Sequence, residues 1–377
     1  MKRALIVGID GQLGYYLSEL LVSLKYQVYG IGVAEHKERA KFLPFSKEVE
    51  ISYPDMKHDG LPKRIVAEFR RSEIYILTPA NAANDNGQGN FDQDLAGHNS
   101  FILRIMIENR LLNQDEWPRL FHACTCNLYG QTDSLPQDEL TPLNFSLLSK
   151  DPVLKAYRYV HTFRNTFGLH ASSGILFDYS SPYHFESCFP GYVSSMLCKI
   201  VLGKEEQLRV GDLLPRRDWG HAREYARAMY LALQQDFADD YVIASGVSVS
   251  REILIYHAAR QLGLTIRFAG IKKDRRGYLT HIDIPLFKRK VGEPCLKSIQ
   301  LKIVQDDLSK PDIPDIEKAI VVVDPAAYTS NEPFFLLGDY SKAKKQLNWS
   351  ANLYLVDLMR EMINSDLKRI KVGVKQS

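Results

Sequence analysis

Residues 3–14 read Arg-Ala-Leu-Ile-Val-Gly-Ile-Asp-Gly-Gln-Leu-Gly, a short apolar run that leads into three closely spaced glycines. The run is typical of a strand buried on both faces, and residues 15–24 carry apolar side chains at helical spacing. In such a turn Gly8 permits the tight bend, Gly11 lets a pyrophosphate approach, and Gly14 lets the helix pack on the sheet. The stretch predicts a dinucleotide-binding turn whose helix N-terminus faces phosphates, with a purely structural turn as the alternative.

Strand and helix patterns alternate through the first half of the chain. The predicted strands and helices are, in chain order, residues 27–31, 74–78, 95–112, 120–125, 154–167 and 173–177. This alternation implies βαβ units and therefore an α/β protein with a Rossmann-like doubly wound parallel sheet. We expect a dinucleotide-binding domain over residues 1–180 and a smaller mixed α/β substrate-binding lobe over residues 181–377. The patterns leave open whether strands of the 220s to 240s return to the first domain.

The rhythm changes after about residue 180. Helices are predicted at residues 193–202 and 221–235, with an extended segment at 207–210 between them. Residues 270–315 are rich in Lys, Arg, Asp and Pro without a clean period, which predicts a long surface excursion outside the core. Residues 353–371 have the pattern of an amphipathic C-terminal helix.

Composition excludes several classes of protein. Of the 377 residues, 45% are hydrophobic and 25% charged, which are globular proportions that exclude disordered and fibrous chains. The net charge of +3 gives no reason to expect a nucleic-acid partner. No apolar run reaches the roughly 18 residues of a membrane span, so we expect a soluble, cytoplasmic protein. The five cysteines include no CxxC pair and the ten histidines show no metal spacing, which predicts free thiols and no metal.

The choice of dinucleotide stays open. An acidic residue at the end of the second strand binds ribose hydroxyls, whereas basic residues there take a 2′-phosphate. After Ile31 the chain has Gly32, Val33 and Ala34, which are neither acidic nor basic. Charged side chains follow slightly late, at Glu35, Lys37 and Arg39.

The chain resembles a known family in several blocks that keep their order. Residues 4–14, ALIVGIDGQLG, are similar to the ALITGITGQDG opening of GDP-mannose 4,6-dehydratases, which belong to the extended short-chain dehydrogenase/reductase superfamily. The blocks Gly-Ile-Leu-Phe at 174–177 and Arg-Asp-Trp-Gly-His-Ala at 217–222 also agree, as do Leu-Gly-Asp at 337–339 and Leu-Asn-Trp at 347–349. The resemblance runs from residue 3 to about 367.

This resemblance implies an N-terminal NADP-binding domain, a C-terminal GDP-mannose lobe, and assembly as dimers or tetramers through helices of the nucleotide domain. In the family the cofactor takes a hydride from sugar C4, water leaves across C5–C6, and the hydride returns at C6. We therefore expect NADP or NAD as cofactor. The cofactor-contacting residues that the resemblance and the glycine turn indicate are Gly8, Gly11, Gln12, Leu13, Gly14, Asp55, Met56 and Leu77.

The family's catalytic residues are only partly retained. Its Ser-Thr-Ser-Glu-Leu-Tyr-Gly strand end reads Cys-Thr-Cys-Asn-Leu-Tyr-Gly at 124–130, so Thr125 remains and Asn127 replaces the catalytic carboxylate. An amide cannot serve as a proton-transfer base. The family's Tyr-x-x-x-Lys is also missing: one register places Ser149 at the tyrosine, and a register shifted by two residues places Asp151 there and retains Lys155.

Residues expected near the substrate also depart from the family. Its Asn-His-Glu-Ser-Pro-Arg-Arg run appears as Asp-Tyr-Ser-Ser-Pro-Tyr-His at 178–184, and Asp178 places a negative charge where a GDP diphosphate should lie. The Arg-Pro-x-Glu that grips the nucleotide becomes Thr-Ser-Asn-Glu at 329–332, which keeps Glu332. Arg217 is retained and could meet a diphosphate, and His221 could cap a helix or line the pocket.

Three interpretations follow. The first is a catalytically degenerate paralogue, a pseudoenzyme that binds a nucleotide or GDP-sugar weakly. It would act as a partner or regulator, either as a homodimer or homotetramer or in a hetero-oligomer with an active dehydratase. The second is an active nucleotide-sugar enzyme in which Thr125, Asp151 and Lys155 replace the usual set. The third is a conventional dehydratase, a lyase. Tyr157 and His161, four apart on one helix, could form a substitute pair or be ordinary packing residues.

Overall fold

A computed structural model describes residues 1–32, 48–56, 58–77, 91–144, 152–184, 188–304, 316–324, 326 and 335–373. The first lobe is built on a seven-stranded sheet whose neighbouring strands all pair in parallel. In spatial order its strands are β10 (Asp240–Ile243), β6 (Ala171–Leu176), β5 (Arg119–Thr125), β4 (Glu73–Ile76), β1 (Arg3–Val7), β2 (Gln27–Ile31) and β3 (Val49–Ser52). The expected Rossmann-like doubly wound sheet is therefore confirmed.

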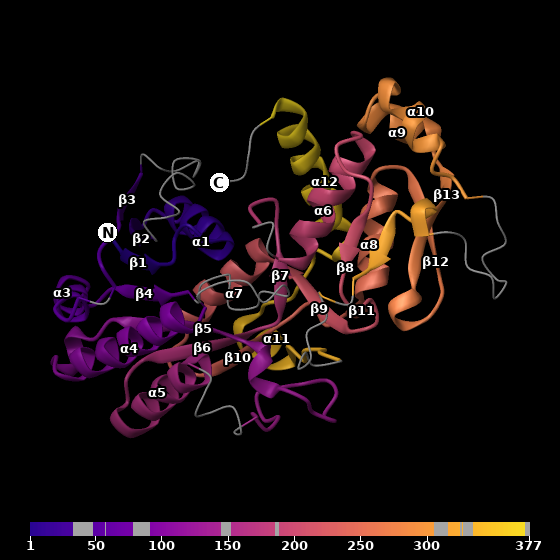
Figure 1. Ribbon diagram of the computed structural model, residues 1–377. Coiled ribbons are helices and arrows are strands. Elements are labelled where there is room, and N and C mark those ends of the chain that lie inside the picture. The colour runs from indigo at the N-terminus through magenta and orange to yellow at the C-terminus, as the bar shows by residue number, and fades with distance from the viewer. Residues whose placement is uncertain are drawn as a thin grey trace.

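Helices cover both faces of this sheet (Figure 1). Along β1, Ala4 and Ile6 belong to the core under one helical layer, while Leu5 and Val7 belong to the core under the other. This alternation follows from the two-residue period of a strand. The first layer contains α1 (Gln12–Ser23), α7 (Ala222–Leu233) and α11 (Ser341–Leu347), and the second contains α3 (Leu61–Glu68), α4 (Phe91–Arg110) and α5 (Pro152–Phe167).

The second lobe has its own core between helices and two small sheets. One sheet has the order β11 (Ser248–Ser250), β9 (Arg216–His221), β7 (Asp178–Ser180). The other has the order β12 (Leu264–Ala269), β13 (Arg276–Ile282), β14 (Val321–Val323), β8 (Leu208–Val210). The α-helices of the lobe are α6 (Phe189–Val201), α8 (Arg251–Gln261), α9 (Ile284–Lys290), α10 (Leu296–Gln300) and α12 (Leu355–Val372). Short 3₁₀ helices lie at Gln114–Glu116, Cys126–Tyr129, Lys272–Asp274, Glu293–Cys295 and Ile316–Lys318.

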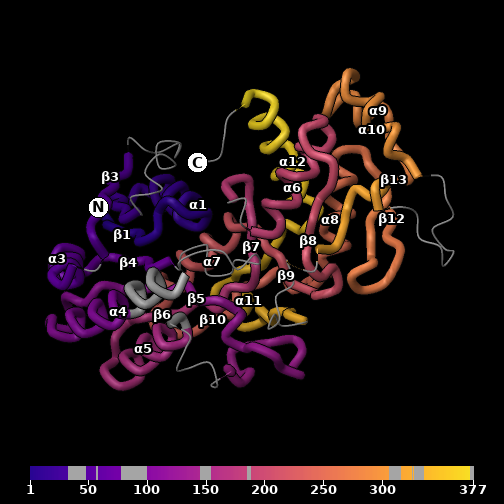
Figure 2. Tube along the Cα trace, viewed as in Figure 1, coloured from indigo at the N-terminus to yellow at the C-terminus, as the bar shows by residue number. Residues whose placement is uncertain are grey.

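The chain passes from one lobe to the other and back (Figure 2). It leaves the large sheet after β6, forms β7, α6, β8 and β9, and returns through α7 and β10 before entering the second lobe again. The carboxyl ends of β5 and β6 consequently lie beside β7 and β9, the strands that begin the second lobe. Side chains from both lobes meet at this place.

The expected surface excursion over residues 270–315 is wrong for the part that the structure describes. Strand β13 is an inner strand of the four-stranded sheet, and Tyr278 and Leu279 are fully buried. The sequence pattern did not reveal β13 because polar residues flank its apolar residues. The basic residues Lys272, Lys273 and Arg275 lie between β12 and β13, where Arg275 forms an ion pair with Glu252 at 2.6 Å. Residues 305–315 lie outside the described residues.

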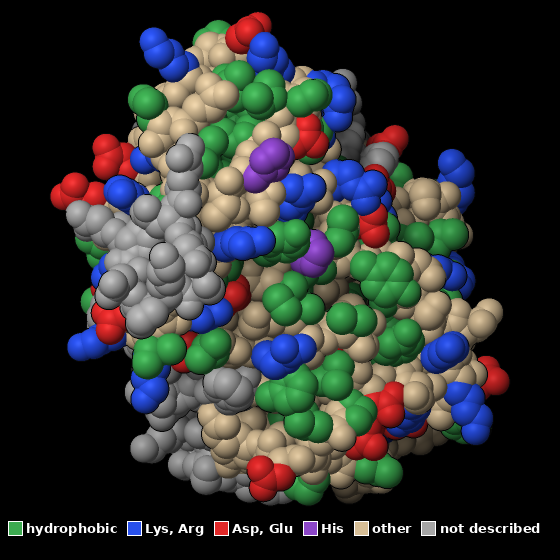
Figure 3. All heavy atoms as spheres, turned by 90° about the vertical axis from the view of Figure 1, so that its right-hand side faces the viewer, with side chains coloured by type: hydrophobic (Ala, Val, Ile, Leu, Met, Phe, Trp, Pro, Cys, Tyr) green, Lys and Arg blue, Asp and Glu red, His purple; other side chains and the backbone are tan. Residues whose placement is uncertain are grey.

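Lys and Arg side chains are spread among hydrophobic and uncharged ones over the face that Figure 3 presents. Among the helices of the described residues, none combines the length and the apolar character that crossing a bilayer requires.

Candidate functional site

The glycine turn between β1 and α1 has the geometry of a phosphate-binding turn. Gly8 has φ +86°, a left-handed conformation that favours glycine. A methyl group on Gly14 would lie 2.6 Å from the Gly8 carbonyl oxygen, so only glycine lets the helix approach the turn. Gly11 precedes the helix in an extended conformation and no side chain caps it. The first bond of the helix runs from the Tyr15 N–H to the Gly11 carbonyl, so the N–H groups of residues 12–14 point out of its N-terminus.

The side chain of Gln12 has a partner within the protein. It is 3% exposed, and its Oε1 accepts a hydrogen bond of 2.6 Å from the Ser181 hydroxyl. Two residues further, the ring of Tyr183 stacks on Tyr15 with the centroids 3.4 Å apart. Residues 181–183 therefore pack on the first turn of α1, and the amide oxygen of Gln12 already has a partner within the protein.

The other expected cofactor residues are placed differently from one another. Leu77 directly follows β4 and donates its N–H to the Val7 carbonyl at 3.0 Å, so it lies beside Gly8. Met56 packs against the apolar core under α3 and α4, whereas Asp55 is exposed and its carbonyl accepts the His58 N–H. A role of these residues in cofactor binding stays a prediction.

A further acidic residue reaches the end of β2. A methyl group on Gly32 would lie 3.4 Å from Oδ2 of Asp10 and 2.8 Å from Cε1 of Tyr53. Asp10 comes from the glycine turn and Tyr53 from the end of β3. Sequence reasoning missed Asp10 because it is 22 positions from Gly32 in the chain, and only the folded turn brings the two together.

Thr125 and Asn127 stand at the carboxyl end of β5, where the sequence predicted catalytic residues. The Thr125 hydroxyl accepts the Asn127 N–H at 3.2 Å and so caps the 3₁₀ helix Cys126–Tyr129. The Asn127 Oδ1 accepts a hydrogen bond from Nη1 of Arg217 at 3.5 Å. Nε of Arg217 in turn lies 3.9 Å from Oδ2 of Asp178. We call these three side chains the Asn127–Arg217–Asp178 cluster.

This cluster is mostly shielded from solvent. Arg217 is 6% exposed, and the Asp178 side chain is 28% exposed. Burying a guanidinium is costly unless opposite charge and hydrogen-bond acceptors surround it, and Asp178 and Asn127 supply both. The amide oxygen of Asn127, the residue that the sequence predicted at the position of the catalytic carboxylate, therefore faces a cation. The arrangement can hold an anion near Arg217. The Asn127 amide accepts a hydrogen bond but is not a base that could take up a proton.

On helix α5, Tyr157 does not supply a substitute phenolate. The Tyr157 hydroxyl donates to Oδ2 of Asp240 at 2.8 Å, and Arg164 contacts both carboxylate oxygens of Asp240 at 2.7 and 2.8 Å. Burial raises the pKa of Tyr157 further, the opposite of what a catalytic phenolate requires. Tyr157 is thus a packing residue at the sheet edge. Lys155 is half-buried on the same helix, and Ser149 and Asp151 lie outside the described residues, as does Glu332.

His221 caps a helix and does not line an open pocket. Its Nδ1 accepts the Arg223 N–H at 3.0 Å at the start of α7, and its Nε2 lies 3.3 Å from Oε2 of Glu361 on α12. The ring is fully buried and packs edge-on against Tyr16. Burial lowers the pKa of His221, and the Glu361 carboxylate offsets part of this effect. Trp219, two residues earlier, stacks on Phe189 in the core of the second lobe.

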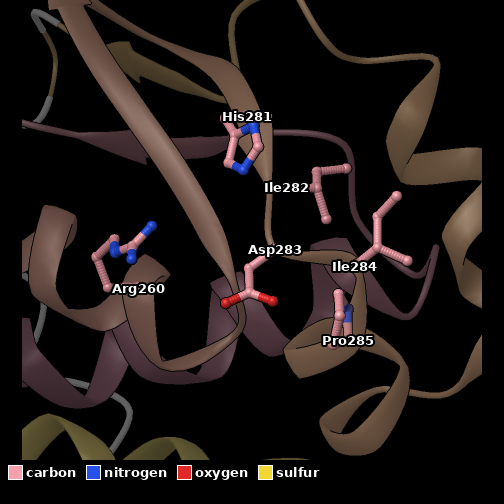
Figure 4. Close-up of a pocket in the computed structure, with 6 residues that line it drawn as sticks. All are labelled: Arg260, His281, Ile282, Asp283, Ile284 and Pro285. Atoms are coloured by element: carbon pink, nitrogen blue, oxygen red, sulfur yellow. The ribbon is translucent and has the colours of Figure 1, made fainter.

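A hollow of about 410 Å³ lies elsewhere, between the end of α8 and the start of α9. Figure 4 shows the Asp283 side chain between Arg260 and Pro285, with His281 on the neighbouring strand. Both charged groups already have local roles, because Asp283 caps α9 through the Leu286 N–H and Arg260 donates to Thr265 Oγ1. We assign no part of the candidate site to this hollow. In the described part of the chain, His, Cys, Asp and Glu side chains nowhere gather in threes as metal ligands would.

Comparison with known proteins finds relatives that match almost the whole chain. A family model described as GDP-mannose 4,6 dehydratase matches residues 5–362. The chain is 33% identical to the GDP-mannose 4,6-dehydratase of Sinorhizobium fredii (strain HH103), with 100% of this chain and 99% of the relative covered. Identity to that of Vibrio cholerae is 31%, with 97% and 94% covered. Identity to the human GDP-mannose 4,6 dehydratase is 29%, with 98% and 92% covered.

Solved structures agree with the fold. A UDP-glucuronic acid 4-epimerase from Bacillus cereus, in complex with UDP-glucuronic acid and NAD, aligns with a TM-score of 0.68 at 14% identity, covering 98% of this chain and 99% of that one. A dTDP-glucose 4,6-dehydratase from Bacillus anthracis in complex with NAD aligns with a TM-score of 0.66 at 13% identity, covering 98% of each chain. At these identities the likeness extends to the fold alone.

The position of His221 predicts how stability depends on pH. Its pKa in the folded protein is below that in the unfolded chain, near 6.5, so in acid the unfolded chain binds a proton that the folded form resists. Stability should therefore fall as pH drops through about 6.5 and recover as pH rises. In His221→Asn the amide oxygen still caps α7 but does not titrate. We expect its free energy of unfolding, from urea titrations between about pH 5 and 7.5, to depend less steeply on pH than that of the wild type.

The matched control for this experiment is His281→Asn, which removes an exposed imidazole from the second lobe. It should keep the wild-type pH dependence. Equal slopes for His221→Asn and the wild type would contradict the prediction.

Proposed function

The chain belongs to the GDP-mannose 4,6-dehydratase family, and we propose that it is a catalytically degenerate member that binds a nicotinamide dinucleotide and a GDP-sugar without dehydrating the sugar. The Asn127–Arg217–Asp178 cluster carries this proposal. Dehydration needs a base for the C5 proton, and here an amide that accepts a hydrogen bond from a buried guanidinium occupies that position. The positive charge of Arg217 favours the binding of an anion and does not provide a base for proton abstraction.

The tyrosines near the strand end support the same conclusion. Tyr129 donates its hydroxyl to the Asp138 carbonyl at 2.7 Å, and Tyr157 is committed to Asp240. Burial raises the pKa of both phenols. Hydride removal from sugar C4 needs a base that takes the hydroxyl proton, so neither phenol suits that step.

Binding of the two ligands rests on separate features. The N–H groups at the start of α1 suit the pyrophosphate of NADP or NAD, and structural neighbours are described in complex with NAD. A GDP-sugar would meet Arg217, the retained cation at the junction of the lobes. Asp178 offsets part of that attraction, so we propose weak binding.

We also propose that the protein acts in an assembly. In this assembly a second copy of the chain binds through α4. Ile107 near the end of α4 and Leu111, the residue that follows this helix, are four positions apart and 43% and 72% exposed. Arg104 and Ser100 continue the same exposed stripe toward the start of the helix. An apolar pair of this kind on an outer helix of the nucleotide domain fits the dimers that the family forms. Exchange of one copy for an active dehydratase would make the protein a regulator.

The test of degeneracy is a turnover assay on the purified protein. With GDP-mannose and NADP⁺ or NAD⁺ we expect no 4-keto-6-deoxy product by NMR and mass spectrometry, because base and phenolate are both missing. The Vibrio cholerae relative run in parallel is the positive control. Readily detected product would overturn the proposal. A different conversion of GDP-mannose that disappears in Lys155→Met or Thr125→Val would favour the alternative of an active enzyme with substituted residues.

Removing the charge of Asp178 should strengthen GDP-sugar binding. Asp178→Asn restores a neutral amide and releases Arg217 to meet the diphosphate, and we expect the calorimetric Kd for GDP-mannose to fall about tenfold. Asp133→Asn, in an exposed loop, removes an equal charge away from the site and should leave Kd unchanged. Weaker or equal binding in Asp178→Asn would argue against a repulsive role for this carboxylate.

Light scattering tests the assembly. The wild type should elute as a dimer or larger species, and Leu111→Glu should shift it toward monomer because a charge would be buried at the contact. Leu301→Glu is a matched control, since Leu301 is 83% exposed on the second lobe and should not affect assembly. If the wild type is monomeric on its own and binds an active dehydratase, the proposed homo-oligomer is wrong. The result would then support the hetero-oligomer.

A further inference from the structure

The end of β2 lacks the side chain that usually distinguishes the two nicotinamide dinucleotides. In dinucleotide folds this position meets the adenosine ribose, and an acidic residue there binds the 2′-hydroxyl while a basic one binds a 2′-phosphate. Here the strand is followed by Gly32, which has no side chain to do either. Its backbone N–H donates to the Ser52 carbonyl at 3.1 Å, so the strand end is held against β3.

Asp10 brings a carboxylate to this position from a different part of the chain. A side chain on Gly32 would begin 3.4 Å from both Cγ and Oδ2 of Asp10, so this carboxylate stands beside the place where the usual discriminating residue would project. Tyr53 closes the other side of the same spot, 2.8 Å from that position. The carboxylate of Asp10 thus lies at the end of β2, where dinucleotide folds bind the ribose, although no acidic residue follows the strand directly.

The turn holds Asp10 firmly in this place. The N–H groups of Gly8 and Ile9 both donate to the Ile31 carbonyl, at 2.8 and 3.2 Å, which joins the glycine turn to the last residue of β2. Asp10 follows immediately and is 8% exposed. The backbone just before Asp10 is therefore anchored to the end of β2, and the side chain itself is largely enclosed.

We propose that Asp10 makes this protein select NAD(H) over NADP(H), by accepting hydrogen bonds from the adenosine ribose hydroxyls and repelling a 2′-phosphate. This inference rests on the proposed binding of a dinucleotide at the glycine turn. It differs from the NADP use that the family resemblance implies. Lys37 and Arg39, which lie outside the described residues, represent the opposite outcome, in which basic side chains hold the phosphate.

The experiment titrates the purified full chain calorimetrically with NADH and NADPH, and with adenosine 5′-monophosphate and adenosine 2′,5′-bisphosphate. The two nucleotides isolate the effect of the 2′-phosphate from the nicotinamide half. We expect NADH to bind on the order of 10- to 100-fold more tightly than NADPH, because like charges in contact are strongly unfavourable. Asp10→Asn should narrow this difference mainly by tightening NADPH, and the nucleotide pair should follow the same trend.

Glu50→Gln provides the matched control, since it removes an exposed acidic charge from neighbouring strand β3 and should keep the wild-type preference. Thermal unfolding of Asp10→Asn checks that the turn is intact, and the wild-type comparison stands even if this variant is unstable. Equal or tighter binding of NADPH by the wild type overturns the role of Asp10 alone. A preference for NADH that persists unchanged in a folded Asp10→Asn overturns it too. Binding of none of the four ligands overturns both this inference and the dinucleotide part of the proposed function.

Discussion

The buried carboxylate of Asp218 joins the two lobes, and the candidate site depends on it. Its Oδ1 accepts the Ser245 N–H and hydroxyl at 2.8 and 2.6 Å, and its Oδ2 accepts the N–H groups of Gly246 and Gly338 at 2.9 and 3.3 Å. These contacts join β9 to the loop after β10 and to the segment before α11. Burial raises the pKa of Asp218 to about 6, and the four hydrogen bonds limit the rise. Removing one acceptor oxygen would leave buried donors unpaired.

Arg217 takes its position from this junction. It precedes Asp218 on β9, so consecutive side chains of the strand point to opposite faces. On one face the carboxylate of Asp218 contacts backbone N–H groups at the edge of the large sheet. On the other face the guanidinium of Arg217 contacts Asn127 and Asp178. The same local structure therefore holds the lobes together and places a cation at their junction. This coupling gives the block around Arg217 and Asp218 a structural role that does not depend on catalysis.

Much of the fold was predictable from sequence because buried parallel strands are continuous apolar runs. Strand β2 was predicted at its observed bounds, and β5 and β6 within two residues, since little besides burial decides them. Strand β13 was missed because charged residues precede it and the adjacent Thr280 and His281 interrupt its apolar run. At the site, Asn127 was found from its position in a block of sequence. Its pairing with Arg217, and the pairing of Gln12 with Ser181, join residues 90 and 169 positions apart, which no local pattern reveals.

The glycine turn shows why a retained motif is weak support for a retained ligand. Gly14 is required because a methyl group there would collide with the carbonyl oxygens of Gly8 and Ile9, whether or not a phosphate is bound. Gly8 is required by its left-handed backbone. Packing alone therefore preserves these glycines, whereas side chains that face a ligand are free to change. Asp10 and Asp178 are two such side chains, and each brings negative charge to a place where a phosphate of the family's ligands is expected. On the proposals made above, their charge, more than the glycine motif, would decide which nucleotides the fold accepts.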